Sequence, residues 1–179
     1  TIVRNCTTTS IRAGRSSARL RTPTNFIGNH FDNVLLWLYN APYIEGPKPK
    51  NFLFENNYIS GDENPFVLVN SSNVIIKSCE IDNGFIQCKK NSDRIIFDDV
   101  SWINMSDDML KVFDNSTAYV LDGCTRNGSQ ENLYAWGMEE QGSKIYYYTP
   151  SDYPRKIPPE SDMNVGNNSG FSDHSNEIK

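Results

Sequence analysis

Apolar and polar residues recur along this chain in one short pattern, an apolar strand segment that ends at small polar positions. The last residues of successive copies are 24, 27, 22, 21 and 24 positions apart. A recurring period of this size is typical of a solenoid, in which each repeat buries its apolar side by stacking on its neighbours. Because the repeated unit is a strand, the pattern predicts an all-β fold, a right-handed parallel β-helix. The copies span residues 1–6, 25–30, 52–57, 74–79, 95–100 and 119–124.

Three columns of equivalent residues are expected to run along this stack, because strand side chains alternate between two faces. The first is apolar in every copy and is predicted to point inward: Val3, Ile27, Phe54, Ile76, Phe97 and Leu121. The last residues are also predicted to point inward, beyond a bend: Cys6, His30, Asn57, Cys79, Val100 and Cys124. The residues between them are predicted to form a corner in left-handed backbone: Asn5, Asn29, Asn56, Ser78, Asp99 and Gly123.

A second strand is predicted ahead of the later copies, at residues 66–69, 85–88 and 109–112, with turns at 70–72, 90–92 and 114–116. We expect regular coils over residues 1–127, with further coils missing upstream. Residues 128–153 are predicted to form an aromatic-rich cap, which either plugs the end of the core or stacks on sugar rings. Residues 154–179 are rich in Pro, Ser, Asn, Gly and charge, which predicts an extended or disordered tail.

One outward column is also predicted to be apolar: Ile2, Phe26, Leu53, Ile75, Ile96 and Val120. A bare stripe of this kind would be an unusual exposed patch on a monomer. Two explanations stay open at this point. Either the stripe joins three copies of the chain into a homotrimer, or the C-terminal segment folds back over it.

Composition excludes several classes of partner. The net charge of −5 and the pI near 5.0 argue against nucleic-acid binding, which needs a basic surface. The chain has no run of 18 apolar residues, so no membrane span is predicted. Four cysteines and two histidines occur without metal-ligand spacing, and three of the cysteines share one repeat position. We therefore expect a stacked cysteine column, and neither a metal nor a cofactor.

The segment from residue 12 to residue 59 has features beyond those that β-helices share. It contains Tyr43-Ile-Glu-Gly-Pro47 just before the strand segment at residues 51–59. This order resembles the β-helix glycosidases that act on terminal α-1,3-linked galactose, although the longer substrate loops of that family have no counterpart after Asn70. The compact coils, the Asn corners and the apolar stripe are also similar to the trimeric β-helices of phage tailspikes. Both resemblances imply a carbohydrate ligand and an extracellular or virion-associated protein.

Glycoside hydrolysis needs two carboxylates on one surface. The first candidates for the catalytic pair are Asp107 and Asp108, which immediately precede a predicted strand. Their position resembles the catalytic pair of polygalacturonase-type hydrolases, whose Gly-His-Gly and Arg-Ile-Lys motifs are absent here. Asp before a strand is also a common turn former. A second pair, Glu80 and Asp82, flanks Ile81 and is predicted to face away from the core, either as substrate ligands or as a solvated surface.

Other residues are candidates for substrate binding rather than for chemistry. Glu45 lies in the glycosidase-like segment, and Trp37 lies at an expected outward strand position suited to a sugar platform. Arg15 and Arg19 belong to a basic insert that could hold acidic sugars or simply be solvated.

Two functions follow from these observations. The first is a carbohydrate-active β-helix, a glycoside hydrolase or a polysaccharide depolymerase of tailspike type, with hydrolysis favoured over lyase chemistry. The alternative is a non-enzymatic structural or adhesive segment of a virion or cell-surface protein.

Overall fold

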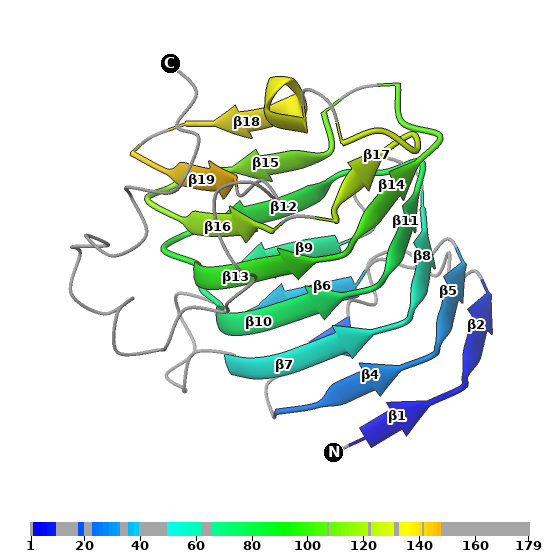
Figure 1. Cartoon of the computed structure of the whole chain (residues 1–179). Coiled ribbons are helices and arrows are strands. Elements are labelled where there is room, and N and C mark those ends of the chain that lie inside the picture. The colour runs from blue at the N-terminus through cyan, green and yellow to red at the C-terminus, as the bar shows by residue number, and fades with distance from the viewer. Residues whose placement is uncertain are drawn as a thin grey trace.

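The chain folds into a parallel β-helix whose coils are built from three strands each. The computed structural model describes residues 2–9, 18–19, 23–32, 36–39, 50–61, 66–106, 108–121, 123–130, 133–140 and 142–147. Successive strands along the chain contribute in turn to three parallel sheets, called sheets A, B and C (Figure 1). The predicted all-β solenoid is therefore confirmed. Each coil has three strands, whereas the sequence patterns predicted two.

Sheet A has seven strands: β1 (Ile2–Arg4), β4 (Asn25–Ile27), β7 (Lys50–Glu55), β10 (Ser72–Lys77), β13 (Asp93–Asp98), β16 (Thr117–Val120) and β19 (Lys144–Tyr147). Sheet B has six: β2 (Thr7–Thr9), β5 (His30–Asp32), β8 (Tyr58–Ser60), β11 (Glu80–Asp82), β14 (Ser101–Ile103) and β17 (Thr125–Arg126). Sheet C has six: β3 (Ala18–Arg19), β6 (Leu36–Tyr39), β9 (Phe66–Val69), β12 (Ile86–Lys89), β15 (Leu110–Val112) and β18 (Gly137–Glu139). One 3-10 helix, η1 (Leu133–Trp136), precedes β18.

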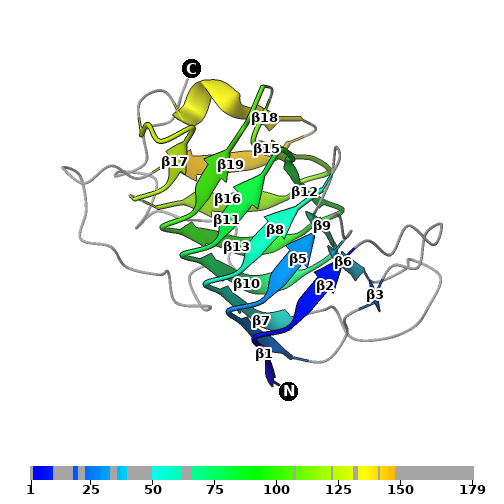
Figure 2. The ribbon, with the colours of Figure 1, turned by 90° about the vertical axis from the view of Figure 1, so that its right-hand side faces the viewer.

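Strand pairing continues past residue 127, where the regular sequence pattern ends. Strand β18 pairs with β15, and β19 pairs with β16, so residues 137–147 extend sheets C and A by one more strand each. Figure 2, turned toward sheet B, shows these two strands above β15 and β16 at the same end of the stack as η1.

The core is a set of apolar ladders enclosed by the three sheets. In sheet A the inward column contains Val3, Phe26, Phe54, Ile76, Phe97 and Val120. The Phe26 and Phe54 rings stack with centroids 4.8 Å apart, which is the spacing of neighbouring strands. Stacked apolar side chains of this kind supply most of the favourable free energy of folding.

The sequence prediction of the inward column is wrong by one residue in two of the six copies. Phe26 and Val120 point inward where Ile27 and Leu121 were expected. The same shift moves His30 out of the inward column, because Asn29 takes that position and His30 is exposed. In the second copy Gly28, with a φ of 65°, forms the left-handed corner in place of Asn29.

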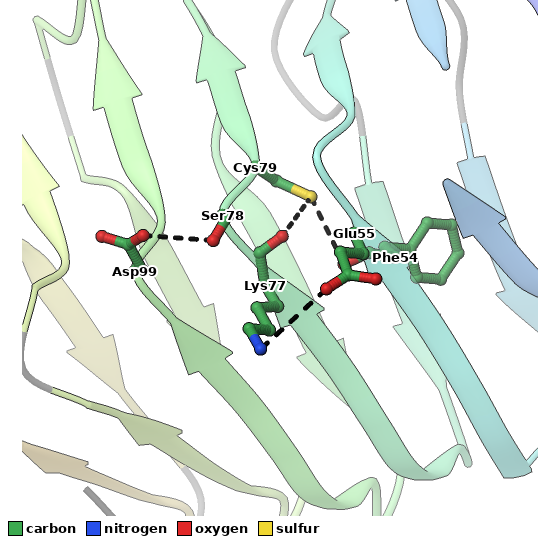
Figure 3. A network of polar contacts seen from close by, with 6 residues as sticks. All are labelled: Phe54, Glu55, Lys77, Ser78, Cys79 and Asp99. Carbon is green, nitrogen blue, oxygen red and sulfur yellow. Dashed lines mark hydrogen bonds and ion pairs between the residues drawn. The ribbon is translucent and has the colours of Figure 1, made fainter. Parts of the chain in front are cut away.

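The corner between sheets A and B is closed by side chains that bond along the stack. Asn29 and Asn57 are buried, and the Asn57 Oδ1 atom accepts from both the backbone N–H and the Nδ2 atom of Asn29, at 2.9 and 3.0 Å. One coil further on, the Cys79 thiol takes the equivalent position and donates to the backbone oxygen of Phe54 at 3.4 Å (Figure 3). The stacked column that contains Cys6, Cys79 and Cys124 is thus confirmed, with all cysteines as free thiols.

A second ladder lies at the corner between sheets C and A. There the backbone N–H groups of Ser71, Ser92 and Ser116 each donate to the hydroxyl of the next serine along the stack, at 3.1 Å each time. The last acceptor is Ser143. These serines are buried, so the ladder satisfies backbone groups that water does not reach.

The outward column on sheet A contains Ile2, Asn25, Leu53, Ile75, Ile96, Tyr119 and Tyr146, so the polar Asn25 interrupts the predicted apolar stripe. Ile2 is 57% exposed, whereas Ile96 and Tyr119 have no exposed surface within the single chain. The prediction that Phe26 and Val120 belong to this stripe is wrong, because both point inward. A homotrimer joined through the stripe stays a prediction.

Asn57 lies in the middle of the corner ladder, and its removal is expected to destabilise the fold. Asn57→Ala would leave the Asn29 backbone N–H and the Phe26 backbone oxygen without their partner, at a cost of about 2–4 kcal/mol in the free energy of unfolding. Urea denaturation measures this, with the exposed Lys50→Ala as control, expected to change stability by less than about 0.5 kcal/mol. An Asn57→Ala variant as stable as the control would contradict the role of the ladder.

The buried thiols predict a loss of stability at alkaline pH. Burial raises the pKa of both Cys79 and Cys88, so the folded protein keeps these protons where the unfolded chain loses them. Stability is then fully present below pH about 8.5 and falls above it, by about 1.4 kcal/mol per pH unit for each thiol. Denaturation curves at increasing pH should show this slope, reduced in Cys88→Ala and unchanged in the exposed Cys6→Ala. An equal slope in the wild type and Cys88→Ala would refute this explanation.

Candidate functional site

The outer face of sheet B is open along its described strands, whereas parts of the other two outer faces are covered. On sheet A the outward side chains of β13, Arg94, Ile96 and Asp98, are all buried. On sheet C the outward Val67 and Val69 are buried as well. On sheet B the outward positions are exposed or half-buried, and only the central residue of each described triplet points into the core. A ligand can therefore reach sheet B directly.

Polar side chains on this face form two rows that run along the axis of the β-helix, across the strands. The first row contains Thr7, His30, Tyr58, Glu80, Ser101 and Thr125. The second row contains Asp32, Ser60 and Asp82 at the ends of β5, β8 and β11, and the apolar Ile103 follows it at the end of β14. The triplets polar–apolar–polar place both rows outward, because alternation along a strand buries the middle residue.

A groove of about 450 Å³ follows the second row, where sheet B turns toward sheet C. Its lining comes from four successive coils and consists of Asp32, Tyr58, Ser60, Gly61, Asp82, Asn83 and Asn104. Asn83 and Asn104 form the corner itself, with φ values of 51° and 55°. The backbone of these corners is tied to the stack, since the Asn83 N–H donates to the Ile103 oxygen at 3.0 Å.

Asp82 is the centre of the hydrogen-bond network in this groove. Its Oδ2 atom accepts from the Tyr58 hydroxyl at 2.5 Å, and its Oδ1 atom accepts from the Asn104 Nδ2 atom at 2.8 Å. The donors come from the coils on either side of Asp82. This carboxylate is therefore held in one orientation before any ligand arrives.

Tyr58 acts in this network as a neutral donor. Its hydrogen bond to Asp82, with a smaller contribution from burial, raises the pKa of Tyr58 to about 12. The phenol stays protonated at neutral pH and is unsuited to act as a base. Its ring stacks on the exposed His30 imidazole, with centroids 4.5 Å apart and an angle of 24° between the planes.

A second carboxylate, Asp32, lies at the other end of the groove. Its Oδ1 atom accepts from the Ser60 hydroxyl at 2.7 Å. Since only β8 separates β5 from β11, the Cα atoms of Asp32 and Asp82 are about 9–10 Å apart. Glu80 is exposed two residues before Asp82 on the same face.

The described acidic residues that the sequence proposed for catalysis and for substrate binding lie on different faces. Glu80 and Asp82 face outward together on β11, as predicted. Asp108 lies at the start of sheet C, where its carboxylate is 3.7 Å from the Lys111 ammonium, and it does not line the groove. The Lys111 ammonium also lies over the Phe85 ring, 4.0 Å from its centroid. Asp107 is outside the described residues, so the proposed Asp107–Asp108 pair stays a prediction.

The proposed substrate-binding residues are only partly placed. Glu45 and Arg15 lie outside the described residues. Arg19 is in β3 and pairs with Trp37 in β6, on sheet C rather than sheet B. Trp37 lies in β6 between the buried Leu36 and Leu38, and its outward orientation stays a prediction.

The described part of the chain offers no metal centre and no membrane helix. Within these ranges, no three His, Cys, Asp or Glu side chains come together as potential ligands of a metal ion. The helical residues there include no segment with the length and hydrophobicity needed to cross a bilayer.

Comparisons with protein-family models, with curated proteins and with solved structures found no match to this chain. The resemblance to α-1,3-galactosidases and to phage tailspikes therefore stays a prediction from sequence. The structure shows the fold: the chain is a parallel β-helix.

Proposed function

We propose that this protein binds a glycan along the outer face of sheet B, with the groove around Asp82 as its binding site. The observation that carries the proposal is the row of fixed acceptors and donors on an open face of a rigid scaffold. Sugars present many hydroxyl groups, and sites for small ligands fix them with a few convergent polar side chains. Ser60, Asp82, Asn83 and Asn104 supply such groups from three successive coils.

The hydrogen bonds inside the groove support this proposal further. Asp82 and Asp32 already have partners on neighbouring coils, so their side chains lose little freedom when a ligand binds. The Tyr58 and His30 rings add apolar surface next to the polar atoms, which suits the mixed polar and apolar faces of a pyranose. An extracellular or virion-associated setting belongs to the same proposal.

Hydrolysis of the bound glycan is a second candidate, favoured by the two carboxylates in one groove. Inverting glycosidases place their carboxylates about 6.5–9.5 Å apart, and side chains on β5 and β11 can meet that range from Cα atoms about 9–10 Å apart. In this scheme one carboxyl protonates the leaving oxygen while the other activates water. Without cleavage, the same surface would serve an adhesive β-helix.

Glycan binding is expected to depend on Asp82 and Tyr58. Asp82→Ala removes the central acceptor and should weaken binding at least about tenfold, whereas Tyr58→Phe keeps the ring and should weaken it by about threefold. A glycan array that spans neutral, amino and acidic sugars identifies a ligand, and calorimetry measures its affinity. Glu55→Ala removes a carboxylate from the outer face of sheet A and should leave binding unchanged. If the wild type binds a glycan and Asp82→Ala binds it equally well, the groove is not the binding site.

The release of reducing ends from the bound glycan tests hydrolysis. If Asp32 and Asp82 are the pair, Asp32→Asn and Asp82→Asn should each lower the rate by about 10²–10⁴-fold, while Asp108→Asn keeps it. The opposite result, with activity lost in Asp107→Asn or Asp108→Asn alone, would move the chemistry to the predicted pair. Binding without any cleavage would leave adhesion as the function.

A further inference from the structure

The charged groups of the groove point to the kind of glycan that it takes. The charged side chains among its described lining residues are Asp32 and Asp82, and both are acids. Glu80, which is exposed, adds a third carboxylate on the same face of β11. Residues 33–35 and 62–65, which follow the groove residues in sequence, contain no Lys or Arg.

Of the two arginines that the sequence suggested for acidic sugars, Arg15 lies outside the described residues. Arg19 belongs to sheet C. Arg126 is nearer, on β17 at the end of sheet B, but its guanidinium stacks on the Trp136 ring at 3.6 Å from the centroid and donates to the Met105 oxygen. Lys111 is paired with Asp108. A uronic or sialic carboxylate in the groove would therefore meet two aspartates and no described basic partner.

The carboxylates also keep acceptor capacity that the described residues do not use. An ionised carboxylate offers about four lone-pair sites. The described contacts occupy one such site on each oxygen of Asp82, from Tyr58 and Asn104, and one on Asp32, from Ser60. The described donors are all neutral. The remaining acceptor sites, with their full negative charge, are available to donors of a ligand.

From these observations we propose that the groove prefers a glycan that carries free amino groups, and that it discriminates against acidic glycans. The inference rests on the proposed function. An ammonium group donates to a carboxylate as a charge-assisted hydrogen bond, which is stronger than the bond from a sugar hydroxyl. Repulsion between like charges gives the discrimination against uronic acids.

Matched oligosaccharides of one length test this inference. The probes are an oligomer of glucosamine, the same oligomer fully N-acetylated, and an oligogalacturonate, compared by calorimetry in a weakly acidic buffer of low salt. The glucosamine oligomer should bind about three- to tenfold more tightly than its N-acetylated counterpart, and the oligogalacturonate least tightly. The preference should shrink with added salt, because the groove is open to solvent.

Substitutions assign the preference to the groove. Asp82→Asn and Asp32→Asn should each reduce the preference for free amines, whereas Glu55→Gln, with the same change of charge on sheet A, should keep it.

The outcomes separate this inference from the proposed function. Equal or tighter binding of the neutral or the acidic oligomer, still weakened by Asp82→Ala, overturns the preference while the groove remains a glycan site. A ligand from the array that lacks amino groups and outcompetes the glucosamine oligomer does the same. If no glycan of any class binds, the proposed function fails and the inference fails with it.

Discussion

The structure depends on one constraint, that every coil must pair its backbone polar groups with the coils above and below it, through the corners as well as along the strands. Parallel pairing does this along the three sheets. At the corners the chain turns away from regular pairing, and the buried side chains of the Asn29–Asn57–Cys79 column and of the serine ladder bond to backbone groups there. Each coil thus fixes the position of the next coil along the axis of the β-helix. Equivalent outward residues on neighbouring coils are therefore about 4.8 Å apart.

Sequence patterns predicted this architecture where the strands are long and the core positions are large. The segments at β7, β10 and β13 each have six residues with three consecutive apolar residues, and their inward residues Phe54, Ile76 and Phe97 were assigned correctly. In the second copy the strand has three residues and is followed by Gly28 and Asn29, both of which suit a corner. Only the stack decides between them, because Asn29 must bond to Asn57 on the next coil.

The candidate site was harder to predict because it lies on the sheet that sequence patterns missed. Each described triplet of sheet B buries a single central residue, such as Phe31, Ile59 or Ile81, and three residues are too few to show a periodicity. Glu80 and Asp82 were recognised since they flank an obvious core residue. Tyr58, Asp32 and Asn104 were not, because their contacts join coils that are 22 to 28 residues apart in sequence. The available signal was a polar–apolar–polar triplet directly after the corner in three successive coils, at β5, β8 and β11.

The first row on sheet B also has a consequence for how a linear polymer can lie on it. The scaffold repeats from coil to coil, so on geometry alone a chain of sugars could slide along the axis by one step and meet an equivalent backbone. The side chains of that row do not repeat, since imidazole, phenol, carboxylate and hydroxyl follow one another at His30, Tyr58, Glu80 and Ser101. The repeating backbone aligns a polymer along the axis of the β-helix. The non-repeating side chains favour one register of the polymer over the others.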